Sequence, residues 1–181
     1  MMRPVLALVA AGLVGCGWHA GLVLPDGSHS VGVAIPRSDP EVLERDLEPL
    51  LHDHLSRAVS DLVDASLVSP DDADLVLESR IVGYQRRAGV RSKEQVLLET
   101  AVGIVVEAKL VRRATGEVLG STRASIPAGY VTADRVGEGH DPSDFLQGGR
   151  ENELDARDRV LRFIADQVVL DLFGTQEPEV P

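Results

Sequence analysis

Four basic side chains surround one glycine in the middle of the sequence. Arg86, Arg87, Arg91 and Lys93 lie on either side of Gly89. A guanidinium group offers forked donors, so a cluster of such groups suits phosphate or carboxylate, which accept two hydrogen bonds at once. These four residues form a candidate anion-binding site. The alternative is a solvated hairpin tip, whose charges only discourage aggregation through a sheet edge.

The single cysteine, Cys16, is the second candidate for chemistry. Arg3 provides a positive start, and residues 5–14 form an uncharged apolar run. This run is shorter than the roughly 20 residues that span a bilayer, and it is typical of a secretory signal peptide. Leu13-Val14-Gly15-Cys16 resembles the lipobox of bacterial lipoproteins, in which the cysteine is acylated and becomes the new N-terminus. The alternative is an ordinary signal peptide with a chance cysteine.

Other residue patterns give no support for an enzyme or a metal site. His52 and His54 are two residues apart in a predicted helix, so they point to different faces. The aspartates at residues 71–74 lack the glycine and the distal glutamate of a calcium loop. His140 has no serine placed as in a nucleophile elbow. We therefore predict no catalytic residue, no metal and no cofactor apart from a covalent lipid on Cys16.

The amino-acid composition limits the classes of protein to which this chain can belong. The 181 residues suffice for one domain, and 44% of them are hydrophobic while only 3% are aromatic. The core must therefore be aliphatic. The net charge of -11 would repel phosphate at long range, which argues against nucleic-acid binding. Residues 80–123 are the exception, with nine basic and four acidic residues.

A strand and a helix are predicted ahead of the basic cluster. Alternating apolar residues over 31–35 predict a strand that ends at Pro36. Asp39 before Pro40 is typical of a helix start, since Asp caps a helix and Pro suits its first position. The helix should kink or divide at Pro49. Its predicted apolar face carries Leu43, Leu47, Leu50, Leu51, Leu55, Ala58 and Leu62.

Three strands with a period of two are predicted next. They span 75–84, 96–110 and 118–126, and Thr115-Gly116 marks a tight hairpin between the last two. The even-numbered residues of the middle strand form an apolar face, as in a sheet covered on one side. The same alternation places Val118 on the buried face, and places Tyr84 opposite the buried face of its strand.

The closing segments complete the predicted architecture. Residues 127–149 read as a long loop, 151–173 as an amphipathic helix whose apolar face includes Leu154, and 175–181 as a loose tail. The order strand-helix-strand-strand-strand-helix predicts an α+β fold, a two-layer sandwich in which two helices cover one face of a four-stranded mixed sheet. The first strand should be parallel to another strand. The predicted organisation is a signal peptide over 1–15, a lipidated tether over 16–30 and one domain over 31–174.

Several segments together resemble the lipopolysaccharide (LPS) assembly lipoprotein family LptE. The resemblance covers most of the chain after the lipobox, and the order of the segments carries it. The resembling segments are Cys16-Gly17-Trp18-His19, Val31 to Ile35, Pro40 to Glu44, Ala73 to Leu77 with Ile81 and Tyr84, Val102 to Leu110, Thr115 to Leu119, and Asp155-Ala156-Arg157.

The resemblance implies a non-enzymatic lipoprotein of the outer membrane. Members of this family sit inside the β-barrel LptD, help it fold and contact LPS on its way to the cell surface. The implied partners are therefore an LptD-type barrel and LPS, whose lipid A phosphates would suit Arg86, Arg87, Arg91 and Lys93. Gly17, directly after the cysteine, fits the outer-membrane sorting pattern of such lipoproteins. The lipid on Cys16, which would include palmitate, would be the only membrane attachment. The alternative is a lipoprotein that activates a cell-wall synthase or pilots a secretion channel.

Overall fold

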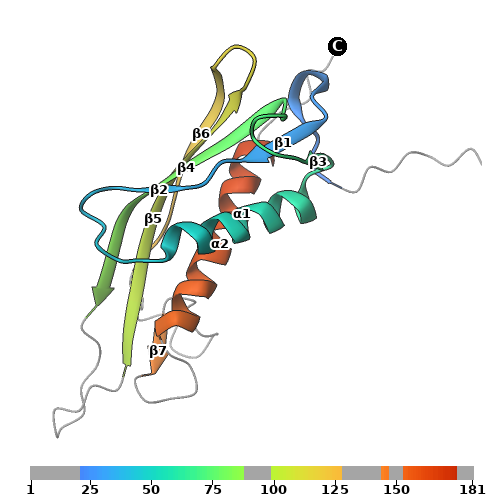
Figure 1. Cartoon of the computed structure of the whole chain (residues 1–181). Coiled ribbons are helices and arrows are strands. Elements are labelled where there is room, and N and C mark those ends of the chain that lie inside the picture. Colours follow the sequence, from blue (N-terminus) through green and yellow to red (C-terminus); the bar gives the residue numbers. More distant parts are fainter. Residues whose placement is uncertain (1–20, 88–98, 128–143, 147–152, 175–181) are drawn as a thin grey trace, which may run out of the picture.

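The fold is a mixed β-sheet with two helices packed on one of its faces (Figure 1). The computed structural model describes residues 21–87, 99–127, 144–146 and 153–174. Its elements are η1 (Pro25–Gly27), β1 (Ser30–Val33), β2 (Arg37–Ser38), α1 (Leu47–Leu62), β3 (Ser66–Leu67), β4 (Leu75–Arg87), β5 (Glu99–Arg112), β6 (Glu117–Ile126), β7 (Asp144–Leu146) and α2 (Glu153–Gly174). The predicted α+β class is confirmed.

The sheet has seven strands rather than the predicted four. Its main order is β3-β1-β4-β5-β6, while β2 pairs with β4 and β7 pairs with β5. β1 runs parallel to β3 and β4, while β5 is antiparallel to both β4 and β6, so the predicted mixed sheet is confirmed. The three additional strands β2, β3 and β7 have only two or three residues each. Such short segments carry no alternating pattern, because only their pairing with longer strands defines them.

The core lies between the helices and the long strands. The apolar face of β5 is buried as predicted from Val102 to Leu110, and Ile104 is fully inaccessible to solvent. The predicted hairpin is also confirmed, since Gly116 has a φ of +73°, a conformation that favours glycine. Leu47, Leu51 and Leu55 of α1 and Leu161, Ile164 and Val168 of α2 complete an aliphatic cluster.

The first helix begins seven residues later than predicted. α1 starts at Leu47, so Pro49 lies in its first turn, where no backbone N–H is needed for a bond within the helix. The predicted kink at Pro49 is therefore wrong. Leu43 lies ahead of the helix and is 87% exposed, and Leu154 in the first turn of α2 is also exposed. Both were wrongly predicted to lie on buried faces.

Two bulges move side chains to the face opposite the one that strict alternation predicts. The β4–β5 register shifts between Ile81 and Gly83, so Tyr84 pairs with Ile104 and faces the helices. The β5–β6 register shifts beside Leu110, so Val118 pairs with Val111 on the open face and is 53% exposed. A bulge inserts one residue, which reverses the alternation after it.

The predicted loop over 127–149 contains a short strand. β7 pairs with the first residues of β5, at Glu99–Leu146 through Ala101–Asp144. The rest of this loop from residue 128, and the tail 175–181, lie outside the described residues. β7 therefore joins two parts of the chain that are about 45 residues apart in the sequence.

Candidate functional site

The basic cluster begins at one end of the sheet, and the β5–β6 hairpin lies at the other. Arg86 of β4 pairs with Val102 of β5, whereas Leu75 at the start of β4 pairs with Arg112. Arg86 and Arg112 therefore lie toward opposite ends of the β4–β5 pair. The described chain also begins at the hairpin end, where Leu22 bridges to Val63 beyond α1 (Figure 1).

The structure describes the side chain of only one predicted anion ligand. Arg86 is 55% exposed, and its guanidinium is paired with the carboxylate of Glu153 on α2. Arg87 is the last residue of β4. Arg91, Lys93 and the predicted lipid site Cys16 lie outside the described residues. Arg86, the first residue of the predicted anion site, therefore already has a carboxylate partner.

Arg86 belongs to a polar network that joins both helices to the sheet. Tyr84 donates its hydroxyl hydrogen to Glu153 Oε1 at 2.7 Å, and Arg157 Nε donates to Tyr84 Oη at 3.0 Å. Arg157 also pairs with Glu153 and with Glu44 ahead of α1. Its side chain is only 11% exposed, and its guanidinium lies 5.2 Å from the centre of the Tyr84 ring. We call Glu44, Tyr84, Arg86, Glu153 and Arg157 the Glu153 cluster.

The cluster fixes the charge states of its members. Burial alone would raise the pKa of Glu153, but hydrogen bonds from Arg86, Arg157 and Tyr84 outweigh it and lower that pKa to about 2. Burial and the hydrogen bond to Glu153 raise the pKa of Tyr84 to about 12. At neutral pH the carboxylate is therefore ionised and the phenol keeps its proton. The cluster is a structural clamp that joins β4 to α2 and to the segment ahead of α1.

This clamp predicts a pH dependence of stability. A carboxylate whose pKa is lowered on folding stabilises the fold above its ordinary pKa of 4.5, and this contribution is lost as the pH falls toward 2. At about 1.4 kcal/mol for each unit of pKa, the loss for Glu153 is at most about 3.5 kcal/mol. Urea unfolding between pH 5 and pH 2 should show a shallower decline for Glu153→Gln than for the unchanged protein. Equal declines would contradict this assignment.

The sequence contained partial signals for this cluster. Glu153 and Arg157 are four residues apart, a spacing that brings opposite charges together on a helix. The link to Tyr84 was hidden, because the bulge in β4 turns that side chain toward α2. Glu44 was interpreted as part of a helix that in fact begins at Leu47.

The charged residues at the hairpin end are held by hydrogen bonds within the domain. Asp74 Oδ2 accepts hydrogen bonds from the backbone N–H of His29 and from the backbone and side chain of Ser30. The bonds from His29 and Ser30 lower the pKa of Asp74. Arg113 Nε donates to the carbonyl oxygen of Ala73 at 2.8 Å. Asp74 thus joins β1 to the start of β4.

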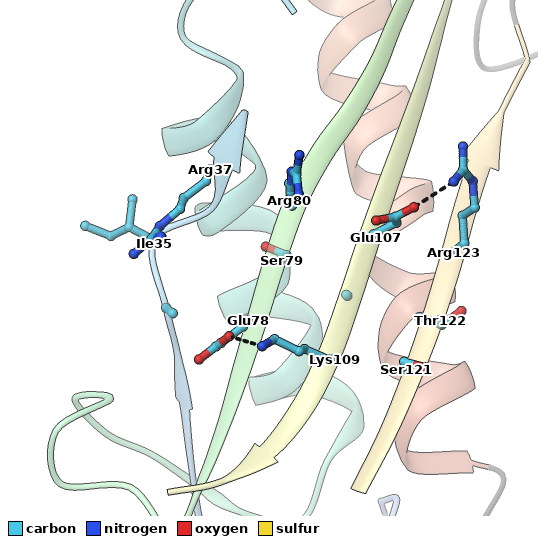
Figure 2. A pocket seen from close by; sticks show the side chains of 12 residues that line it. Ile35, Arg37, Glu78, Ser79, Arg80, Glu107, Lys109, Ser121, Thr122 and Arg123 are labelled. Carbon is cyan, nitrogen blue, oxygen red and sulfur yellow. Dashed lines mark hydrogen bonds and ion pairs between the residues drawn. The ribbon is translucent and has the colours of Figure 1, made fainter. Parts of the chain in front are cut away.

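The face of the sheet opposite the helices forms an open polar groove of about 850 Å³ (Figure 2). Lys109 pairs with Glu78 at 2.8 Å, and Arg123 pairs with Glu107 at 2.6 Å. Arg80 pairs with Asp39. These pairs form charged rows across β4, β5 and β6, so the exposed face is strongly polar while its charges are largely compensated.

The described residues supply neither a metal site nor a spanning helix. No three of their His, Cys, Asp and Glu side chains gather as metal ligands would. His54 is buried, and its Nε2 lies 2.9 Å from Asp158 Oδ1 on α2, while His52 lies elsewhere on α1. None of the helices in the described part is both long and apolar enough to cross a bilayer.

Comparison with known families gives a match that covers nearly the whole domain. The family model of LptE, described as lipopolysaccharide-assembly, matches residues 29–172. No curated protein sequence matches the chain.

Three solved structures illustrate the likeness of the fold. The chain is similar to protein XCC0632 from Xanthomonas campestris, with a TM-score of 0.54, 14% identity and coverage of 86% of this chain and 93% of that one. It is also similar to the PelC dodecamer from Paraburkholderia phytofirmans, with a TM-score of 0.52, 14% identity and coverage of 86% and 96%. CT253 from Chlamydia trachomatis gives a TM-score of 0.50 at 12% identity, covering 81% and 97%. At these identities the likeness shows a shared fold alone.

Proposed function

Because this chain belongs to the LptE family of lipopolysaccharide-assembly proteins, we propose that it is a non-enzymatic lipoprotein of LPS transport at the outer membrane. It binds inside or against a β-barrel partner of the LptD type and contacts LPS. Lipid on Cys16 attaches it to the membrane, and the domain faces the periplasm. The family match over residues 29–172 is the observation that carries this proposal.

The polarity of the open sheet face supports a barrel partner. The interior of an outer-membrane barrel is polar and in many cases filled with water, so a domain held there needs a charged exterior. The rows formed by Glu78 with Lys109 and by Glu107 with Arg123 provide one. Because these charges compensate one another, the face is well hydrated without repelling a partner of either sign.

The basic loop remains the proposed contact for LPS. Arg86 is engaged by Glu153, so the proposal assigns phosphate contact mainly to Arg87, Arg91 and Lys93, with Arg86 holding the start of the loop. A phosphate can accept bidentate hydrogen bonds from each arginine.

Co-purification tests the function as a whole. The full-length lipidated protein, carrying a C-terminal tag, is extracted from its own outer membranes in mild detergent, and the bound proteins are identified by mass spectrometry. We expect an LptD-type barrel in near-equal amount. Recovery of a peptidoglycan synthase or of a secretin in its place would favour the alternative role as an activator or a pilot.

Replacing Cys16 with Ser is expected to abolish acylation. The serine hydroxyl cannot form the thioether on which the lipoprotein signal peptidase acts, so the precursor should accumulate uncut. Metabolic labelling with an alkyne fatty acid, followed by gel analysis, measures this directly. Ser28→Ala serves as the control and should be labelled as strongly as the unchanged protein. Label that persists in Cys16→Ser would rule out the assigned lipid site.

Removing charge from the loop is expected to weaken LPS binding. Charge-assisted hydrogen bonds contribute about 1.5–3 kcal/mol each, so Arg91→Ala combined with Lys93→Ala should lower affinity by about tenfold or more. Binding by the unchanged protein should also weaken with added salt. The measurement is a titration of purified protein with fluorescent LPS at two salt concentrations.

A double variant on the helices controls for the loss of net charge. Arg57→Ala combined with Arg162→Ala removes two exposed cations of the helices and should leave the affinity for LPS unchanged. Equal effects of the two double variants would mean that the loop is only a solvated tip.

A further inference from the structure

One row of the open sheet face is apolar, in contrast to the charged rows beside it. Val76 of β4 pairs with Val111 of β5, and Val111 pairs with Val118 of β6. Their neighbours in the strands, Leu75, Leu77 and Leu110, are buried beneath the helices, so the three valines point to the opposite face. We call Val76, Val111 and Val118 the valine row. The next row on the same face is Glu78, Lys109 and Ser121.

The apolar surface continues across the sheet toward β3. Gly32 of β1 pairs with Val76, and Pro70 packs so closely over Gly32 that an added Cβ would lie 2.5 Å from the Pro70 Cα. Val68 follows directly on β3 and donates its N–H to the carbonyl oxygen of Val31. The open face therefore carries an apolar band from Val68 to Val118 at one end of the strands.

This end of the domain is also where the chain leads back to Cys16. Leu22 lies against Val63 beyond the end of α1, and the next residue, Val23, is 65% exposed. Leu22 lies six positions after Cys16 in the sequence, and a fully extended chain of that length spans at most about 20 Å. A lipid on Cys16 therefore keeps this end of the domain within about 20 Å of the bilayer, and docking becomes an intramolecular event at high effective concentration.

Charged side chains at the same end of the domain determine which lipid headgroups this end favours. Asp61 and Asp64 lie at the end of α1, and Asp71 and Asp72 lie in the turn before β4. Of the cations at this end, Arg112 pairs with Glu117 and Arg113 is bonded to the carbonyl oxygen of Ala73. These carboxylates are repelled by an anionic surface, and the valine row favours the boundary between headgroups and acyl chains.

We infer that the valine-row end of the domain docks on the bilayer surface that holds the Cys16 lipid, with a preference for zwitterionic headgroups. The Glu153 cluster lies toward the opposite end of the strands. This inference rests on the lipid anchor of the proposed function and adds a second, non-covalent contact with the membrane.

Depth-dependent quenching tests the docking. The full-length acylated protein contains no other reactive thiol, so Val118→Cys accepts a single environment-sensitive fluorophore. The labelled protein is reconstituted into phosphatidylcholine vesicles that contain a nitroxide-bearing phospholipid. We expect several-fold stronger quenching of the label at residue 118 than of the same label on Ser125→Cys, an exposed position of the same strand nearer the opposite end. Circular dichroism melts establish that both labelled proteins are folded.

The lipid composition and the anchor separate the possible outcomes. Adding phosphatidylglycerol should reduce quenching at residue 118, whereas increased quenching would overturn the preference for zwitterionic headgroups. Equal quenching at residues 118 and 125 in an acylated protein would overturn the docking while leaving the proposed function intact. Mass spectrometry of the N-terminal peptide reports acylation, and its absence would overturn the anchor together with this inference.

Discussion

Replacing Ile104 with Asp is expected to abolish stable folding. Ile104 is fully buried in the middle of β5, between Tyr84 of β4 and Ile126 of β6. The surrounding side chains are mainly aliphatic, and the hydroxyl hydrogen of the neighbouring Tyr84 is already donated to Glu153, so a carboxylate there would lack a partner. The expected cost of at least about 4 kcal/mol is a large part of the stability of a domain of this size. Thermal melts followed by far-ultraviolet circular dichroism measure it.

Two substitutions in the same strand provide the controls. Ile104→Val removes one methylene group and should cost about 0.5–1.5 kcal/mol. Glu107→Gln lies on the open face, where its carboxylate pairs with Arg123 across the strands, and should cost less than about 1 kcal/mol. A folded Ile104→Asp protein with an unchanged melting temperature would mean that the wrong face of β5 was assigned to the core.

Replacing Arg157 with Met is expected to cost about 3 kcal/mol of folding free energy. Arg157 pairs with both Glu44 and Glu153 and donates to Tyr84, so its loss leaves two carboxylates without their shared cation. Breaking a buried ion pair by removing one partner is more costly than replacing the whole pair. Met keeps the apolar part of the side chain, which restricts the effect to the charge. Urea unfolding at pH 7 measures the change.

A second arginine of the same helix controls for the loss of charge. Arg162 is exposed on α2, and Arg162→Met should change the free energy of unfolding by less than about 0.5 kcal/mol. Arg157→Lys keeps the charge without the fork and should have an intermediate effect. Similar stabilities of Arg157→Met and Arg162→Met would show that the Glu153 cluster does not clamp the helices to the sheet.

The local pattern of the sequence was sufficient for the long elements and their faces. Strict alternation over residues 96–110 identified β5 and its buried side, because the side chains of a strand alternate between its two faces. Thr115-Gly116 located the hairpin, because its backbone needs a positive φ at the glycine. The order of long strands and helices was enough for the α+β class, and the order of short segments behind the lipobox was enough for the family.

The same local pattern failed where one residue interrupts it. Tyr84 and Val118 were assigned to the wrong faces because each lies beyond a bulge, which depends on pairing with a neighbouring strand. The start of α1 was misjudged because Asp39 and Pro40 have the composition of a helix start. In the structure the Asp39 N–H instead bonds to the carbonyl oxygen of Ile81 in β4.

The sequence by itself therefore determined the element types, the aliphatic core and the position of the basic residues, since these follow from periodicity and composition. Only the tertiary structure decided which charges meet. Tyr84 reaches Glu153 across 69 residues of sequence, and Arg157 reaches Glu44 across 113. The valine row likewise exists only because three strands align in register. Such contacts depend on how distant segments pack, and short-range patterns carry no information about distances of that kind.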